Sequence, residues 1–409
     1  MVNPLDFILG ALAALSCALV VWQFLAARQF PLHQKIAVPG FAPPVSILKS
    51  LKGCDDTTRA SLETWFHQNY TGQIEILFGV ADANDPVCPI VTDLIARNPR
   101  CPARLVICGE SRGMNAKAGK LAKLEKLAQY QLILISDADV RVPADFLASF
   151  VAPLRDENTG LVNCFYRLAN PTTMAMRWEG VAINADFWSQ VLQARTIKPL
   201  DFALGAAILI RRRSLDEIGG FESLTDCLAD DYQLGNRIAK NGHGIALCPV
   251  VVECWDAPMG WNSVWKHQLR WARTIRACQP LPYFFSILAN ATLWPLVWFS
   301  SSVAITRNVY ASLAALAFLL VRIRLAQSLQ RRFTPERTLV SAARLVPAKD
   351  LLQTALWIFA FAGNNVEWRG RKMKLRRDGT LVRVSRPLPL PPVQPQVKNL
   401  PPPVEDILA

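Results

Sequence analysis

Apolar residues alternate with polar ones through the centre of the chain and form long runs towards its two ends. The first run, 7–27, is interrupted only by Ser16 and Gln23, and about 20 consecutive apolar residues are needed to span a bilayer. A cleaved signal peptide is the alternative, but residues 1–6 carry no basic side chain and the run exceeds the roughly 7–15 residues of a signal h-region. The pattern predicts a transmembrane anchor over 1–28.

A second apolar stretch, 281–321, is long enough for two spans, and polar residues stand at its middle, at 306–308. We predict a transmembrane hairpin over 281–322 that turns at these residues. A shorter apolar stretch, 351–363, has basic residues on both sides. This pattern predicts a re-entrant or interfacial helix inside a basic segment, 323–377.

Between residues 44 and 255, short apolar segments alternate with segments of helical periodicity. The alternation predicts a mostly parallel α/β sheet with helices on both faces, in a domain over 40–256. The expected strands are 45–51, 74–80, 104–108, 132–136, 161–165, 203–210 and 245–248. The expected helices are 57–68, 86–97, 116–129, 144–154, 172–194 and 228–240. Because ligands of such sheets bind at the carboxyl ends of the strands, we expect a binding site there.

Carboxylates follow two of these strands. Asp137 and Asp139 come directly after the fourth, where alternate residues can direct two carboxylates at one Mg²⁺ or Mn²⁺ ion. A helix cap or a turn is their alternative role, since Asp favours both. Asp82 and Asp85 follow the second strand, where an acidic side chain either contacts a nucleotide or forms the turn into the next helix.

Further candidates open two of the expected helices. Lys117 begins the helix at 116–129, and a basic residue at a helix N-terminus can meet a diphosphate. Asp230 and Asp231 precede an amphipathic helix, where one carboxylate can act as the base that deprotonates an acceptor hydroxyl, provided that it reaches it. A plain helix start and acidic helix capping are the respective alternatives.

Residues 257–280 combine tryptophans with basic residues beside the expected hairpin. Trp261 and Trp265 lie one helical turn apart, which predicts an amphipathic helix at the membrane surface. Within this helix, Arg270 is a candidate diphosphate ligand and Trp271 a candidate wall of an acceptor site. Both roles are compatible with the interfacial one.

The net charge of +13 favours a phosphate-bearing partner: nucleic acid, anionic lipid or a nucleotide substrate. Many basic residues lie in 322–377 beside apolar runs, which favours the lipid bilayer. Because no nucleic-acid-binding motif occurs, we expect no nucleic-acid partner.

The ten cysteines form no Cys-x-x-Cys pair, so we expect buried thiols in a cytosolic domain. Arg28 and Lys35 follow the anchor, which places the central domain in the cytosol by the positive-inside rule. The proline-rich residues 387–409 predict a disordered tail.

The order of these motifs resembles that of membrane-tethered GT-A glycosyltransferases of the ceramide glucosyltransferase type, which are family 2-like, over about residues 40–375. The matching segments are 45–49, 82–86, Gly113-x-Asn115-x-Lys117, 136–142, 219–221, 229–232, Arg270-Trp271 and Val366-x-Trp368-Arg369-Gly370. The stretch 267–274 is also similar to bacterial hopanoid-associated glycosyltransferases. His267 departs from the pattern, because the broad motif has Gln or Arg there.

The resemblance implies an inverting, UDP-sugar-dependent hexosyltransferase that acts on a lipid hydroxyl. Glucose transfer from UDP-glucose to ceramide is the first expectation, and transfer of N-acetylglucosamine to a hopanoid is the alternative. By the same resemblance, Asp82 contacts the nucleotide, Asp137 and Asp139 bind the Mg²⁺ or Mn²⁺ and the UDP-sugar, and Asp231 is the catalytic base.

The other candidate substrate-binding residues are Asp85, Lys117, Asp230, Arg270 and Trp271. We expect an integral protein of a bacterial inner membrane, with its catalytic domain on the cytosolic face.

Two other functions are alternatives. A processive polysaccharide synthase shares the motifs but needs a channel of several crossing helices, and three spans are expected here. A catalytically inactive scaffold would lack Asp231 or the Asp137 and Asp139 pair, and the chain has them all.

Overall fold

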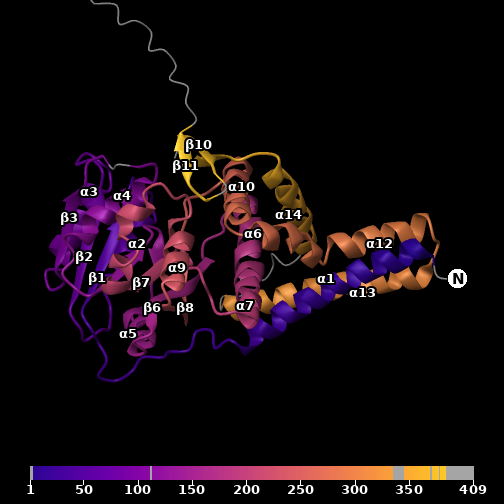
Figure 1. The fold of residues 1–409 in the computed structure, drawn as a ribbon, viewed down its shortest axis with the longest axis horizontal. Helices are drawn as coiled ribbons and strands as arrows, with labels where there is room; N and C mark the ends of the chain where they lie inside the picture. Colours follow the sequence, from indigo (N-terminus) through magenta and orange to yellow (C-terminus); the bar gives the residue numbers. More distant parts are fainter. Residues whose placement is uncertain (1–2, 111–112, 335–344, 369–370, 377, 384–409) are drawn as a thin grey trace, which may run out of the picture.

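A globular α/β domain and a long helical bundle that projects from it make up the protein (Figure 1). The computed structural model describes residues 3–110, 113–334, 345–368, 371–376 and 378–383. The expected proline-rich tail, 387–409, lies outside the described residues.

An eight-stranded mixed sheet forms the centre of the globular domain, in the order β3-β2-β1-β4-β7-β6-β8-β5. The strands are β1 (Val45–Ser50), β2 (Ile74–Val80), β3 (Ala103–Ile107), β4 (Leu132–Ser136), β5 (Val140–Arg141), β6 (Thr159–Leu168), β7 (Ala207–Arg211) and β8 (Gly244–Cys254). Strands β1 to β4 are mutually parallel, whereas β7 is antiparallel to both β4 and β6. The predicted α/β class is confirmed, and the carboxyl ends of β1, β2 and β4 meet at one edge.

Several strands differ in extent from the prediction. β6 and β8 are longer than expected because they pair with each other as far as Leu168 and Cys254. β7 begins at Ala207 rather than at residue 203, because residues 203–206 leave the sheet to line a cavity. β5 was not predicted, since two residues are too few to show an alternation; it pairs with the end of β8.

Helices cover both faces of the sheet. One face carries α2 (Thr58–Glu63), α3 (Cys88–Arg97), α5 (Phe146–Val151) and η1 (Ala152–Arg155), and the other carries α4 (Ala116–Glu125), α8 (Arg212–Asp216), η3 (Phe221–Leu224) and α9 (Asp230–Lys240). Successive side chains of β1 point to opposite faces, so Ile47 joins the first core and Leu48 the second. All six residues of β1 are buried, so this strand is held between the two cores.

The expected helix 172–194 consists of three pieces. They are α6 (Met174–Val181), a π-helical turn η2 (Ala182–Phe187) and α7 (Trp188–Ile197). π-helical turns are rare and occur frequently at functional sites. Here the turn carries Asp186 and Phe187, and both line the cavity described below.

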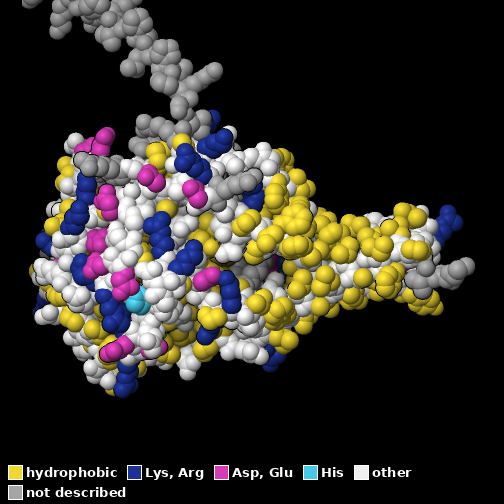
Figure 2. All heavy atoms as spheres, viewed as in Figure 1, with side chains coloured by type: hydrophobic (Ala, Val, Ile, Leu, Met, Phe, Trp, Pro, Cys, Tyr) yellow, Lys and Arg dark blue, Asp and Glu magenta, His cyan; other side chains and the backbone are white. Residues whose placement is uncertain are grey.

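The projecting bundle consists of α1 (Pro4–Gln29), α12 (Leu293–Ala304) and α13 (Val309–Phe333). α1 and α13 are long and apolar enough to cross a membrane. The pair α11 (Pro280–Phe285) and η4 (Ser286–Ala289) continues into α12 with a bend of 44° and adds a third span if it is taken as one broken helix. Figure 2 shows hydrophobic side chains covering the bundle, whereas charged ones gather on the globular domain. The chain is therefore a membrane protein.

The hairpin turns where the sequence predicted, and Asn308 caps α13 by accepting a hydrogen bond from Ala311 N at 3.2 Å. Its second helix does not end near residue 322, however, but continues to Phe333. Arg322 is buried rather than placed at the membrane surface, because carboxylates of other helices surround it. The shorter apolar stretch is α14 (Val346–Phe361), which packs against α10 (Trp261–Cys278).

A second, three-stranded sheet occupies the end of the expected basic segment. It consists of β9 (Asn365–Trp368), β10 (Arg371–Leu375) and β11 (Leu381–Arg383). Basic side chains of α10 bind it: Lys266 Nζ lies 3.1 Å from Glu367 Oε2, and Arg273 donates to the carbonyl of Asn365. Part of the positive charge assigned to the membrane surface therefore stabilises the protein itself.

Candidate active site

A cavity of about 1060 Å³ begins at the carboxyl end of β4 and reaches the membrane helices. Its polar end is lined by charged residues that include Lys117, Asp137, Asp139, Asp230 and Asp231. Its other end is lined by residues of α1, α7, α11, η4 and α14. Apolar side chains there, such as Val20, Val191, Pro282, Ile287 and Trp357, alternate with polar ones such as Gln190 and Thr354. Arg270 and Trp271 line the same cavity, so seven of the nine expected site residues share one continuous space with the membrane helices.

Lys117 joins two of the acidic clusters. Its Nζ lies 2.6 Å from Asp137 Oδ1 and 3.6 Å from Asp230 Oδ2. Burial alone would lower the pKa of Lys117, but Asp137 and Asp230 outweigh it and raise this pKa. The lysine is therefore a fixed positive charge between the end of β4 and the start of α9.

Local sequence explains how Lys117 reaches this place. Asn115 caps α4, because its Oδ1 accepts hydrogen bonds from the backbone N–H groups of Lys117 and Ala118. The side-chain nitrogen of Asn115, Nδ2, also donates to Asp230 Oδ1 at 3.2 Å. Gly113 has a φ of 95° and lies so close to Thr225 that a Cβ atom would clash. The Gly-x-Asn-x-Lys segment thus packs the N-termini of α4 and α9 together.

Asp139 is buried close to two other carboxylates, Asp137 and Asp256. Burial, followed by repulsion from Asp137 and Asp256, raises the pKa of Asp139 to about 7. Beneath it, Lys49 donates to the carbonyl of Asp137 at 2.6 Å, and burial lowers the pKa of Lys49 to about 7. A carboxylate that other carboxylates destabilise is suited to a divalent cation, because the cation would relieve the repulsion.

Among the described residues no group of three or more Asp, Glu, His or Cys side chains could hold a metal ion by itself. Mg²⁺ is commonly bound by one or two carboxylates together with substrate phosphates. Asp137 and Asp139 fit this kind of site, in which the nucleotide diphosphate completes the ligand set.

Asp231 lies in the first turn of α9, next to Asp230. Burial and the neighbouring carboxylate of Asp230 raise the pKa of Asp231 to about 6. Gly205 makes room for it, since a Cβ atom there would come within 2.5 Å of Asp231 Oδ2. One oxygen accepts a hydrogen bond from the backbone N–H of Tyr232 at 2.7 Å. A carboxylate with a pKa near neutrality can accept a proton in a reaction and release it afterwards.

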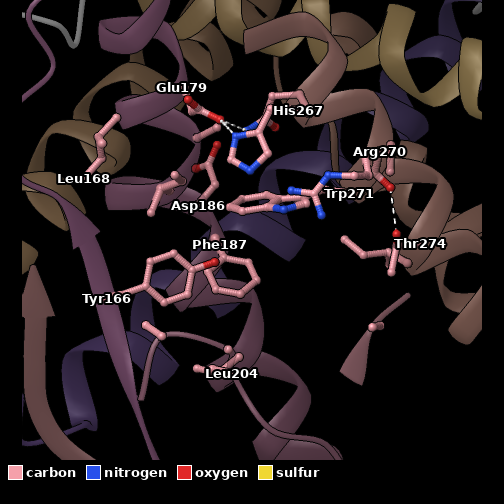
Figure 3. Close-up of a pocket in the computed structure, with 18 of the residues that line it drawn as sticks. Tyr166, Leu168, Glu179, Asp186, Phe187, Leu204, His267, Arg270, Trp271 and Thr274 are labelled. Atoms are coloured by element: carbon pink, nitrogen blue, oxygen red, sulfur yellow. Dashed lines mark hydrogen bonds and ion pairs between the residues drawn. The ribbon is translucent and has the colours of Figure 1, made fainter. Parts of the chain in front are cut away.

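Arg270 and Trp271 border the middle of the cavity (Figure 3). The Trp271 ring lies 6.5 Å from those of Tyr166 and Phe187, which form an aromatic wall with it. Figure 3 shows the Arg270 side chain lying beside Trp271. Both expected residues of this segment therefore line the cavity.

Asp82 and Asp85 do not line the cavity. Asp82 Oδ1 accepts a hydrogen bond from Asn84 N within the turn after β2. Asp85 accepts hydrogen bonds from Gly53 N at 2.9 and 3.1 Å, and Gly53 does line the cavity. Asp85 Oδ1 also accepts a hydrogen bond from Val87 N at 3.0 Å, so its carboxylate connects the loop after β1 with the turn that follows β2.

Five acidic residues of the cavity were not among the expected ones: Asp55, Glu179, Asp186, Asp256 and Asp350. Glu179 and Asp186 stand within the apolar helical stretch 172–194, and a carboxylate among buried helix positions is a signal that could have drawn attention to them. Asp256 follows β8, whose extent was underestimated. Asp186 belongs to a buried cluster with Arg322, which is discussed below.

The fold and the cavity define the class: a GT-A-like glycosyltransferase domain attached to membrane helices. The family model described as Glycosyl transferase family 21 matches residues 8–381, so the chain belongs to that family. The resemblance inferred from the motifs is thereby confirmed.

Three known proteins illustrate the similarity. The chain is 25% identical over 228 residues to ceramide glucosyltransferase 3 of Caenorhabditis elegans, covering 54% of this chain and 48% of that protein. It is 25% identical over 247 residues to a beta-monoglucosyldiacylglycerol synthase of Nostoc sp., covering 59% and 51%. The chain thus spans about half of the length of these curated relatives. The structure of mannosyltransferase PcManGT from Pyrobaculum calidifontis, in complex with GDP-Man and Mn²⁺, shares the fold, with a TM-score of 0.52, 20% identity and coverage of 85% of this chain and 99% of that one.

Proposed function

We propose that the protein transfers a hexose from a UDP-sugar to a hydroxyl of a membrane lipid, with inversion at the anomeric carbon, and that it is a UDP-glucose:ceramide glucosyltransferase. The observation that carries this proposal is the continuity of the cavity, which joins the acidic edge of the sheet to the membrane helices. Lys117 and the carboxylates suit a nucleotide diphosphate, and the apolar side chains of the membrane helices suit a lipid chain.

In the proposed reaction, Asp231 removes the proton of the lipid hydroxyl. The oxygen attacks the anomeric carbon while the bond to UDP breaks on the opposite side, which inverts the configuration. Lys117 and Arg270 lie where positive charge stabilises the departing diphosphate. A divalent cation at Asp137 and Asp139 supplies further charge neutralisation when bound.

The acceptor is tested directly by incubating membranes that contain the protein with UDP-glucose or UDP-N-acetylglucosamine and a panel of lipids. The panel contains ceramide, diacylglycerol and a hopanoid polyol, and mass spectrometry identifies the product. Diacylglycerol is included because of the relative in Nostoc sp., and the hopanoid because residues 267–274 resemble hopanoid-associated enzymes. Glucosylceramide is the expected product, and its absence with another lipid glycosylated would reassign the acceptor.

Removal of divalent cations is expected to stop the reaction. The reason is that Asp137 and Asp139 would then repel both each other and the diphosphate. Activity is measured in excess EDTA and again after Mg²⁺ or Mn²⁺ is restored in excess of the chelator. An enzyme that turns over at the untreated rate in EDTA would contradict the metal assignment.

The globular domain is proposed to face the cytosol. In sealed inside-out vesicles a protease added outside is therefore expected to cleave loops of residues 44–255. The measurement is gel electrophoresis with an antibody to the globular domain, and right-side-out vesicles serve as the control. Cleavage in the control vesicles alone would reverse the orientation.

A further inference from the structure

His267, at the first position of the segment that ends in Arg270 and Trp271, is held by Glu179 of α6. His267 Nδ1 lies 2.8 Å from Glu179 Oε1, and Gln268 Nε2 donates to the same oxygen at 2.8 Å. The His267 ring also packs edge-on against Trp271, with centroids 4.6 Å apart. Because Glu179 is 1% exposed, this contact fixes the imidazole in one orientation.

The other nitrogen of the imidazole faces the cavity. His267 and Glu179 both line it, and Figure 3 shows the Nε2 edge of the ring directed towards the space beside Trp271 and Asp186. Within the part of the chain that the structure describes, Nδ1 has a hydrogen-bond partner and Nε2 has none. A carboxylate next to Nδ1 favours the tautomer with its hydrogen there, which leaves a lone pair on Nε2.

We propose that Glu179 and His267 form a hydroxyl-binding pair, in which Glu179 positions the ring and His267 Nε2 accepts a hydrogen bond from a hydroxyl of a bound substrate. The inference rests on the proposed function, and it concerns substrate binding rather than proton removal, which is assigned to Asp231. The hydroxyl belongs either to the sugar of the donor or to the polar end of the lipid.

The chemistry of the position supports this role. The broad motif has Gln or Arg here; a Gln side chain carries both a donor and an acceptor, whereas an Arg side chain carries donors only. An imidazole whose Nδ1 donates to Glu179 resembles Gln in offering an acceptor, but holds it at a fixed place in the cavity wall. The plainer alternative is that His267 only packs against Trp271, and substitutions can separate the two roles.

Three variants divide the functions of the pair. His267→Asn keeps an amide group at the place of Nδ1, able to bond Glu179, but has no atom at the place of Nε2. His267→Phe keeps a ring against Trp271 and loses both nitrogens. Glu179→Gln keeps the shape of the positioning residue and removes its charge.

In His267→Asn, the KM of one substrate is expected to rise about tenfold, which corresponds to the loss of one hydrogen bond, while kcat changes by less than about twofold. His267→Phe should raise the same KM at least as much, and Glu179→Gln should raise it by less. Each KM is measured with the other substrate saturating. A rise in the KM of the UDP-sugar assigns the hydroxyl to the donor, and a rise in the KM of the lipid assigns it to the acceptor.

His243→Asn is the matched control. His243 also pairs with a carboxylate, with Nε2 2.5 Å from Glu217 Oε2, but neither residue lines the cavity. This variant should keep both KM values. The inference is overturned if both KM values also stay unchanged in His267→Asn, or if only kcat falls. A wild-type protein that transfers sugar to no lipid would instead contradict the proposed function itself, so the two failures are distinguishable.

Discussion

Replacing Asp231 with Asn is expected to lower the rate of sugar transfer by about 10²–10⁴-fold, the usual contribution of a general base. Asparagine preserves the size of the side chain and the contact with Gly205, but it cannot accept the proton of the lipid hydroxyl. Because Asp137, Asp139 and Lys117 remain in place, binding of UDP should survive. Transfer is measured with radiolabelled UDP-sugar and lipid, and UDP binding by calorimetry.

A surface carboxylate provides the control for this substitution. Asp93 lies on α3 and pairs with Arg59 and Arg97 away from the cavity. Asp93→Asn should therefore transfer sugar at the wild-type rate. Turnover of Asp231→Asn at a rate close to that of Asp93→Asn would exclude Asp231 as the base.

The pH dependence of transfer provides a second measurement on the same carboxylate. Burial and Asp230 raise the pKa of Asp231 to about 6, so the carboxylate is protonated below this pH and ionised above it. A base acts only when ionised, so kcat is expected to fall as the pH drops through about 6 and to level off above it. The residual activity of Asp231→Asn should lack this inflection. An inflection that persists in the variant would belong to another group.

The parts of the site that sequence could predict are those encoded locally. Asp137 and Asp139 follow a strand whose apolar run is plain in the sequence, and the carboxyl end of a strand is where α/β sheets bind ligands. Asn115 and Lys117 form a helix start whose spacing is visible in the same way. The long apolar helices were equally predictable, because a bilayer requires about 20 consecutive apolar residues.

What sequence could not predict depends on residues that meet only in the folded chain. His267 and Glu179 lie on different helices, α10 and α6, and no periodic pattern relates one to the other. The role of Asp85 was ambiguous for a related reason: its partner, Gly53, belongs to a loop after another strand. Arg322 was interpreted as the end of a membrane span, because a basic residue after an apolar run usually marks the membrane surface.

Arg322 belongs to a buried charge cluster that joins the membrane helices to the globular domain. Its guanidinium donates to both oxygens of Asp186 at 3.1 and 2.9 Å and to both oxygens of Asp350 at 2.8 Å. Lys349 contacts the same two carboxylates, at 2.6 Å in the case of Asp350. All four side chains are at most 8% exposed. The cluster connects η2, α13 and α14, and two positive charges balance two negative ones.

Arg322→Met is expected to destabilise the protein by about 3–5 kcal/mol, because it leaves two buried carboxylates with only one cation. The measurement is the midpoint of thermal unfolding in detergent. Lys198→Met removes a cation from an exposed pair with Asp201, and its effect should stay below about 1 kcal/mol. The larger loss of stability in Arg322→Met than in Lys198→Met would show that the effect comes from burying the charges.

The double variant Arg322→Met and Asp350→Leu separates charge balance from the loss of a packed side chain. It removes one charge of each sign, so Asp186 and Lys349 remain as a neutral pair, and part of the lost stability is expected to return. A double variant less stable than Arg322→Met would mean that the hydrogen bonds of Asp350 outweigh its unpaired charge. If Arg322→Met unfolds at the wild-type temperature, the carboxylates must be hydrated and the charge cluster contributes little stability. The membrane helices would then be joined to the globular domain by apolar contacts, such as the stacking of Trp188 on Phe333.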